Sequence, residues 1–314
     1  MSKTLDIIIP CFNEEKNIQA LWDELVKILK NIDDLNTSCI FIDDGSTDGT
    51  VKEIKKIQRS NKSVILIEFT RNYGHASALE AGISRSTADA LISIDADLQH
   101  PPILILEMIK KWRQGYLVVS TIRETKTRIN IFKKITSSAF YFVINLISDV
   151  KIHSGSSDYR LIDSRVINTL NSLPESPKFY RGLIPWLGFS EYQIKFHAQP
   201  RLSGETGYSL SKMFELARLG ITSLSFKPLK LIFLTGMGLT LFSSFIFITL
   251  LMIKLIVDYD LFSMTTILLF FVLAFTGILV TLQGIVGLYM IDILRNSRRR
   301  PTYILKFNSS TKAS

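Results

Sequence analysis

The N-terminal part of the chain alternates between short apolar runs and amphipathic segments, and this alternation constrains the fold more than any other feature. The runs that favour strands are residues 5–10, 38–43, 63–69 and 89–95. The segments that favour helices follow them in turn, at residues 14–32, 49–60, 74–84 and 102–115. Strands that are apolar throughout, each followed by an amphipathic helix, are typical of a parallel sheet covered on both faces. The sequence therefore predicts an α/β fold with a mostly parallel sheet.

Two long apolar runs stand near the C-terminal end. Residues 231–253 and 264–291 contain no Asp, Glu, Lys or Arg. As helices, both are long enough to cross a hydrocarbon core of about 30 Å. Lysines precede the first run and arginines follow the second, which favours a cytosolic position for both flanks. We therefore predict a two-helix transmembrane hairpin, about 229–256 and 264–291, in a multi-pass protein of the cell's inner (cytoplasmic) membrane with both termini cytosolic.

This hairpin divides the chain into four parts. Residues 1–210 form a cytosolic catalytic domain and residues 211–228 an interfacial, juxtamembrane amphipathic helix. Residues 229–293 hold the two transmembrane helices, and residues 294–314 form a basic cytosolic tail. Glycines in both apolar runs permit close helix packing, within the hairpin or between protomers. We expect a homo-oligomer in contact with membrane lipid.

Composition narrows the range of partners. The formal net charge of +9 is spread along the chain without a dense basic block, which argues against a nucleic acid partner and favours anionic lipid or a phosphorylated substrate. Cys11 and Cys39 lie in apolar runs, with no Cys or His at metal-ligand spacing. They are therefore expected to be small buried thiols. The N-terminus enters a strand pattern directly, without the apolar stretch of a signal peptide.

Polar residues gather where the predicted strands end. The stretches "PCFNEE", "DDGSTDGT", "TRNYGH" and "DADLQHPP" stand at the ends of the four strands in turn. Each has a local explanation as a helix cap or a turn. In a parallel sheet, however, the carboxyl ends of the strands share one edge, and ligands bind there. The four stretches together favour a binding site.

The last stretch places Asp95 and Asp97 one residue apart after a strand. Like charges repel and Asp is a poor strand former, so this pairing needs a reason. A hard divalent cation, Mg²⁺ or Mn²⁺, would neutralise the pair and take further oxygen ligands from a diphosphate. The sequence has neither a G-x-G-x-x-G after the first strand nor a G-x-x-x-x-G-K-[ST], so phosphates must be held in another way.

These four stretches, with "SSDYRLID", "FYRGLIPWLGF" and "RLSGETGYSLSKM", resemble the motifs of family-2 glycosyltransferases of the GT-A fold. With the hairpin, they resemble the branch that glycosylates polyprenyl phosphate: bactoprenol-phosphate glucosyltransferases and dolichol-phosphate mannose synthases. The resemblance runs from about Thr4 to Arg300. It implies a metal-dependent, inverting transfer of a hexose, glucose from UDP-glucose in the first place, to polyprenyl (undecaprenyl) phosphate. The product would be a polyprenyl-phosphate sugar for cell-envelope glycan modification.

The resemblance also implies roles for individual residues. The catalytic residues are Asp158, Asp97 and Arg160. The residues that bind the nucleotide sugar are Pro10, Asn13, Glu14, Asp43, Asp44, Asp95, Ala96 and Arg201. The cation ligands are Asp95, Asp97 and Gln99. The lipid phosphate is received by Arg123, Lys134 and Ser138, the last two on an amphipathic helix at the membrane surface.

The assignment has three further details. A phosphate monoester with a second pKa of about 6 is already largely dianionic at neutral pH. We therefore expect Asp158 to act as a positioning and electrostatic residue rather than as a proton acceptor, although the role of a base stays open. His100 is expected to be a turn residue rather than a ligand. Gly207 stands where the branch has Lys or Arg, so one phosphate contact is absent or supplied by Lys212.

Several alternatives stay open. The same branch includes GDP-mannose-dependent polyprenyl-phosphate mannose synthases. A processive polysaccharide synthase is disfavoured because the chain has no Gln-x-x-Arg-Trp segment and only two long apolar runs. A non-catalytic membrane scaffold or flippase subunit would be expected to have lost the Asp-x-Asp pair, which is intact here.

Overall fold

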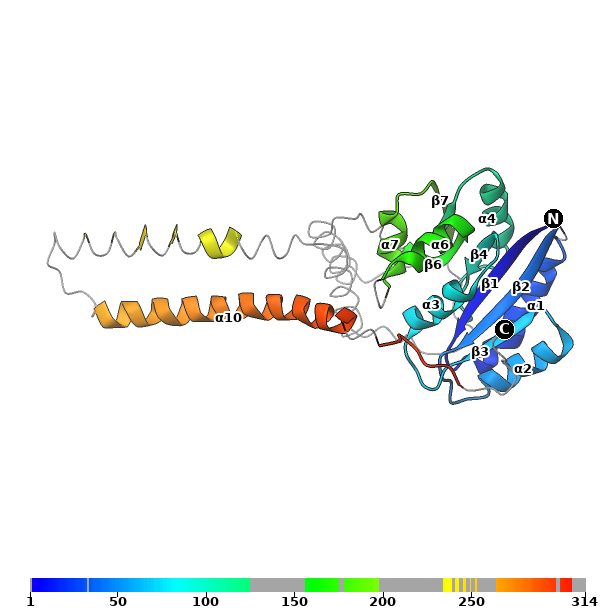
Figure 1. The fold of residues 1–314 in the computed structure, drawn as a ribbon, viewed down its shortest axis with the longest axis horizontal. Coiled ribbons are helices and arrows are strands. Elements are labelled where there is room, and N and C mark those ends of the chain that lie inside the picture. The colour runs from blue at the N-terminus through cyan, green and yellow to red at the C-terminus, as the bar shows by residue number, and fades with distance from the viewer. Residues whose placement is uncertain are drawn as a thin grey trace.

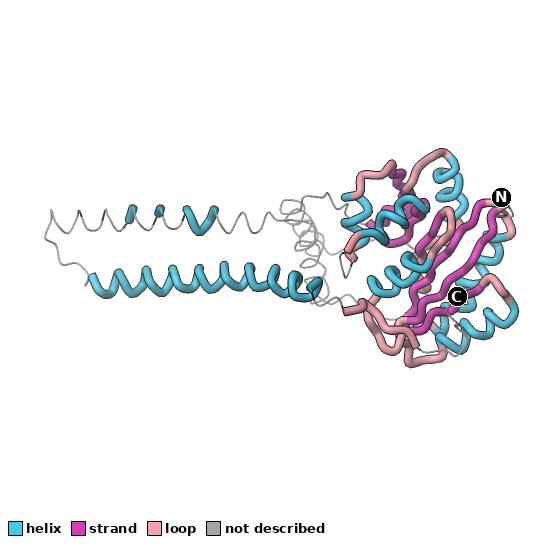
Figure 2. Tube along the Cα trace, in the orientation of Figure 1, coloured by secondary structure: helices cyan, strands magenta, loops and turns pink. Residues whose placement is uncertain are grey.

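The computed structural model describes residues 2–32, 34–124, 156–174, 178–197, 264–297 and 300–306, with short stretches between 234 and 252. An α/β domain stands at one end, and the long helix α10 (Met264–Ser297) extends away from it (Figure 1). Figure 2 shows the strands of this domain lying side by side with helices around them. The predicted juxtamembrane helix 211–228 and the predicted surface helix that carries Lys134 lie outside the described residues.

The domain is built on one seven-stranded sheet in the order β3-β2-β1-β4-β6-β5-β7. Its strands are β1 (Lys3–Cys11), β2 (Leu35–Asp43), β3 (Val64–Glu68), β4 (Ala90–Ser93), β5 (Val118–Glu124), β6 (Ser156–Asp163) and β7 (Glu191–His197). β6 runs antiparallel to both its neighbours, β4 and β5, whereas all other pairs are parallel. The predicted mostly parallel sheet is confirmed.

The helices of the first half lie where the apolar spacing predicts them, within a few residues at each end. The domain contains α1 (Glu15–Leu29), α2 (Thr50–Ser60), α3 (His75–Arg85), α4 (Leu104–Arg113), α6 (Ser164–Ser172) and α7 (Tyr180–Trp186). In α1 the buried apolar residues recur at helical spacing, Ile18, Leu21, Trp22, Leu25 and Ile28, so one face of the helix packs on the sheet.

The core has two halves, one on each face of the sheet. Successive residues of β1 point to opposite faces, so Ile7 and Ile9 pack with the residues of α1 and α4, whereas Ile8 packs with those of α3, α6 and α7. All three isoleucines are fully buried. Cys11 and Cys39 are free and buried among these side chains, as predicted.

Among the residues that the structure describes, no helix combines the length and the hydropathy of a membrane span. The predicted hairpin stays a prediction, and much of the first apolar run lies outside the described residues.

Candidate active site

The predicted site residues lie along the carboxyl edge of the sheet. β1 begins at the end of the domain remote from α10, so its carboxyl end points toward the side from which α10 extends (Figure 1). Asp43 ends β2, and Asp95 follows β4. Antiparallel pairing of Ser93 with Arg160 brings β6 alongside, and the Ser93 hydroxyl donates to the carbonyl oxygen of Asp158. The edge therefore collects residues from strands far apart in the sequence.

Asp158 is a carboxylate that three basic side chains of the site approach. Its Oδ2 accepts hydrogen bonds from Nε and Nη2 of Arg181 at 2.9 and 2.7 Å. Its Oδ1 accepts one from Nη2 of Arg160 at 3.3 Å, and Nε2 of His75 lies 3.5 Å from Oδ2. Burial alone would raise the pKa of Asp158, but the charge of Arg181, the hydrogen bond from His75 and the charge of Arg160 hold it well below the usual range. Asp158 therefore stays ionised.

Two imidazoles flank Asp95, whose side chain is 35% exposed. Nε2 of His75 lies 3.7 Å from one carboxylate oxygen, and Nδ1 of His100 lies 3.5 Å from the other. Burial lowers the pKa of His75, but the carboxylates of Asp95 and Asp158 outweigh it and raise the pKa to about 9. A protonated His75 thus joins the two carboxylates electrostatically.

His100 lies in a bend, as expected, but its side chain has a further role that the sequence did not predict. It is buried, and its Nε2 lies 2.8 Å from the hydroxyl of Ser157. Its ring stacks on Tyr159, with 5.1 Å between the centroids, and meets Phe196 edge-on. His100 therefore ties the turn after β4 to β6 and β7.

The turn after β4 offers oxygen donors suited to a hard cation. Asp97 is buried, and its Oδ1 accepts the backbone N–H of Gln99 at 3.1 Å. The side-chain Oε1 of Gln99 accepts a hydrogen bond from Nη1 of Arg123 at 3.3 Å. Two carboxylates and an amide oxygen fit Mg²⁺ or Mn²⁺ if substrate oxygens complete the shell. Within the described residues, no group of three or more His, Cys, Asp or Glu is arranged to hold a metal.

Two acidic residues at the carboxyl end of β2 hold the loops of the site in place. The carboxylate of Asp44 accepts the backbone N–H groups of Tyr73 and Gly74 at 2.6 and 2.9 Å. Asp43 accepts the N–H of Ser46, and burial raises the pKa of both aspartates.

Neighbouring residues complete this part of the edge. The side-chain oxygen of Asn13, which has φ of 56°, accepts the N–H of Thr47 at 2.9 Å. The N–H of Glu14 donates to the hydroxyl of Thr50 at 2.8 Å. Pro10 pairs with Ile42 inside the sheet, and Ala96 is buried.

The structure thus brings together most of the predicted site residues and adds two. Arg123, predicted for the lipid phosphate, lies beside the predicted cation ligand Gln99. Lys134, Ser138, Arg201 and Gly207 lie outside the described residues. His75 and Arg181 were missed, although both stand in the motifs "TRNYGH" and "FYRGLIPWLGF". A charged residue inside each motif was the available signal.

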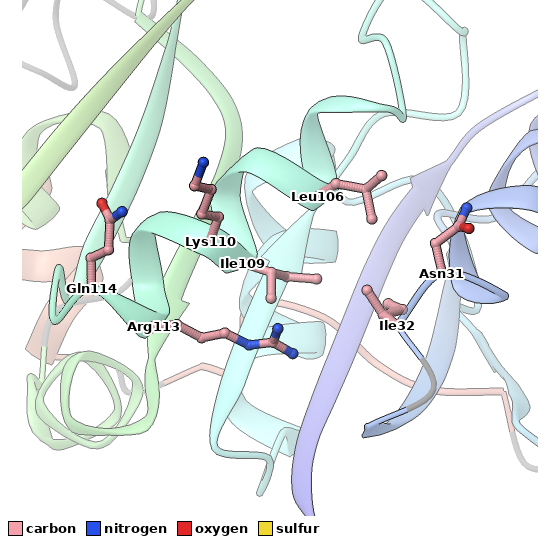
Figure 3. Close-up of a pocket in the computed structure, with 7 residues that line it drawn as sticks. All are labelled: Asn31, Ile32, Leu106, Ile109, Lys110, Arg113 and Gln114. Atoms are coloured by element: carbon pink, nitrogen blue, oxygen red, sulfur yellow. The ribbon is translucent and has the colours of Figure 1, made fainter.

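A cavity of about 500 Å³ lies elsewhere (Figure 3). Side chains of α4 line one side of it and the residues after α1 the other. Its lining residues are Asn31, Ile32, Leu106, Ile109, Lys110, Arg113 and Gln114. None of them belongs to the acidic edge, so the cavity is separate from the candidate active site.

The sheet order and the acidic turn after β4 define a GT-A type fold, and solved structures with this fold are similar to the chain. One is glucosyl-3-phosphoglycerate synthase from Mycobacterium tuberculosis, determined with Mn²⁺, UDP-glucose and phosphoglyceric acid. It is 18% identical with a TM-score of 0.50, and the match covers 70% of this chain and 78% of that one. At this identity the likeness concerns the fold.

The chain belongs to glycosyl transferase family 2, whose model matches residues 6–170. The uncharacterized glycosyltransferase YkcC of Bacillus subtilis is 34% identical, over 96% of this chain and 92% of that protein. The bactoprenol glucosyl transferase of Shigella phage SfV is 32% identical, over 96% and 98%. A prophage bactoprenol glucosyl transferase homolog of Escherichia coli is 31% identical, with the same coverage. The predicted resemblance to family-2 glycosyltransferases, with bactoprenol glucosyl transferases among the relatives, is confirmed.

Proposed function

We propose that the protein transfers a hexose, glucose from UDP-glucose in the first place, to undecaprenyl phosphate. The observation that carries this proposal is the ionised Asp158, which is contacted by Arg160, Arg181 and His75. His75 also approaches Asp95. Such a cluster offers cationic side chains to phosphate groups and carboxylates to a cation and a sugar. Relatives named as bactoprenol glucosyl transferases support the lipid acceptor and the sugar.

In the proposed reaction, an oxygen of the lipid phosphate attacks the anomeric carbon of the nucleotide sugar. The bond from that carbon to the diphosphate breaks, its electrons leave with the nucleoside diphosphate, and the configuration inverts. The attacking phosphate needs no base, because it is largely dianionic near neutral pH. Asp158, whose pKa is low, would be a weak base, and we assign it the task of orienting the guanidinium groups of Arg160 and Arg181.

Metal dependence is part of the proposal. Asp95, Asp97 and Gln99 would hold Mg²⁺ or Mn²⁺, which supplies Lewis-acid stabilisation of the leaving diphosphate when bound. Complexes of glucosyl-3-phosphoglycerate synthase with Mn²⁺ and UDP-glucose and with Mg²⁺ and UDP support this kind of cation for the fold.

We further propose that the protein works at the inner membrane, with the catalytic domain cytosolic. A polyprenyl acceptor resides in lipid, and α10 carries exposed apolar side chains such as Leu268, Val272 and Met290. The homo-oligomer stays a prediction. Reporter fusions test the hairpin. We expect a reporter at Ser314 to be cytosolic and one at Asp260 to be external. A cytosolic reporter at Asp260 would contradict the hairpin.

The decisive experiment is a transfer assay. The full chain in detergent is mixed with undecaprenyl phosphate, Mn²⁺ and one radiolabelled nucleotide sugar at a time, and the lipid extract is counted. We expect label from UDP-glucose, and none with Asp158→Asn. Label from GDP-mannose alone would show that the transferred sugar is mannose and not glucose. No label from any nucleotide sugar would favour the non-catalytic scaffold.

A further inference from the structure

A short segment after α10 returns to the α/β domain and pairs with the backbone at and just after the end of the edge strand β3. Phe69 and Leu305 form an antiparallel bridge. The N–H of Thr70 donates to the carbonyl of Ile304 at 3.0 Å, and the N–H of Lys306 donates to the carbonyl of Glu68 at 2.8 Å. Figure 1 shows the segment in red near β3. We call residues Arg300–Lys306 the tail segment.

Side chains reinforce this pairing. The ring of Tyr303 stacks on that of Phe69, with 4.8 Å between centroids and an angle of 10° between the planes. Phe69 is fully buried and meets Tyr73 edge-on at 5.9 Å. Tyr303 and Leu305 pack against the core on the α3 face of the sheet. The tail segment thus contacts the start of the loop that follows β3.

That loop, residues 69–74, leads directly into the candidate active site. Its backbone donates from Tyr73 and Gly74 to Asp44, and His75, the first residue of α3, approaches Asp95 and Asp158. On the side of the active site, the backbone of the loop packs closely against Gly45. A Cβ placed on Gly45 would lie 2.3 Å from the carbonyl carbon of Arg71, so only glycine admits the loop backbone here.

We propose that the tail segment is a positioning element of the part of the active site that binds the nucleotide sugar. It holds loop 69–74 from the edge of the sheet, while Asp44 and Gly45 hold the same loop from the side of the active site. Together these contacts fix the position of His75, the residue that follows the loop. The segment supplies no group to the reaction. Its kinetic consequence rests on the proposed function, whereas its effect on the loop does not.

Two matched pairs of variants test the proposal. Lys306→Pro removes the N–H that the Glu68 carbonyl accepts, whereas Lys306→Ala keeps that N–H. Both variants lose the ammonium group, which lies 4.0 Å from the Glu68 carboxylate, so the difference between them isolates the backbone hydrogen bond. Tyr303→Ala removes the stacked ring, whereas Tyr303→Phe keeps it. In the full chain in detergent, we expect amide hydrogen exchange at Thr70 and Gly74 to speed up about tenfold or more in Lys306→Pro and Tyr303→Ala. Lys306→Ala and Tyr303→Phe should exchange as the wild type does, and so should the amide of Ile8 in all variants.

The kinetic readout separates positioning from simple loss of stability. We expect Lys306→Pro to raise KM for UDP-glucose about tenfold and to leave KM for undecaprenyl phosphate within about twofold. A merely structural role would lower the active fraction and change neither constant. Unchanged exchange at Thr70 and Gly74 in Lys306→Pro, or an equal rise in both constants, would overturn the proposal. Failure of the wild type to transfer sugar would refute the proposed function, and the exchange result would still decide the role of the tail segment.

Discussion

Arg181 of α7 and Asp158 of β6 form a two-pronged ion pair, in which Nε and Nη2 of the arginine donate to the same carboxylate oxygen at 2.9 and 2.7 Å. Arg160 contacts the other oxygen, so two guanidinium groups share one buried carboxylate. The pair joins a helix to a strand at the carboxyl edge of the sheet. It fixes both guanidinium groups beside the place where phosphates are proposed to react.

Replacing Arg181 should therefore impair turnover more than folding. We expect Arg181→Ala to lower kcat about 100-fold, because it removes a cation from the proposed phosphate site and leaves Asp158 less well oriented. Arg181→Lys should lower kcat about tenfold, since it keeps the charge without the guanidinium fork. The measurement is the transfer assay, with Arg85→Ala, a change at an exposed arginine of α3, as the control. Equal losses for the Ala and Lys variants would argue that only the fork matters.

Asp97 tests the proposed cation. Asp97→Asn keeps the size of the side chain and removes the negative charge, so we expect turnover to fall at least 1,000-fold if a cation bridges to the diphosphate. EDTA should abolish wild-type activity, and added Mn²⁺ or Mg²⁺ should restore it. Circular dichroism provides the check on folding. Full wild-type activity in EDTA would contradict a metal-dependent reaction.

Arg123 tests the acceptor side. Its guanidinium lies beside Gln99 at the exposed end of β5, where a lipid phosphate could reach it. We expect Arg123→Ala to raise KM for undecaprenyl phosphate about tenfold, and KM for UDP-glucose far less. Lys195→Ala is the matched control, because this exposed cation lies on the neighbouring strand β7 and contacts Glu124. A rise in KM for UDP-glucose alone would show that Arg123 does not bind the lipid phosphate.

Asp163 links stability to pH. It accepts the N–H of Arg165 as the cap of α6, and its Oδ2 accepts the indole N–H of Trp112 at 2.8 Å. Burial raises the pKa of Asp163, but hydrogen bonds from Arg165 and Trp112 outweigh it and lower the pKa below its ordinary value. A lowered pKa in the folded state means that this stabilisation is present above the unfolded value of about 3.9 and is lost as the pH falls through the folded value.

We therefore expect Asp163→Ala to reduce the free energy of unfolding at pH 7 by about 1 to 2 kcal/mol. Between pH 7 and pH 3, the free energy of unfolding of this variant should decrease less than that of the wild type. Arg165→Ala should cost less than Asp163→Ala, because the Arg165 side chain is mostly exposed and its ion pair is screened by solvent. Urea unfolding of the full chain, followed by tryptophan fluorescence between pH 3 and 7, measures both. Equal losses for the two variants would show that the salt bridge, rather than the cap and the Trp112 contact, dominates.

The sequence by itself determined the order of strands and helices from β1 to α4 and the cluster of motifs at their ends. Run length, apolar spacing and turn residues are local properties, so they can be read without a fold. The pairing of Asp95 with Asp97 indicated a site for the same reason.

Only the tertiary structure decided which side chains meet. β6 inserts antiparallel between β4 and β5, and this places Asp158 at the edge that carries Asp95, where His75 approaches both carboxylates. Packing of α7 then directs Arg181 to Asp158, and the start of α3 directs His75 to the same carboxylate. The pairing of Leu305 with Phe69 likewise joins distant parts of the chain. Such contacts depend on register and packing between remote segments, which no local pattern encodes.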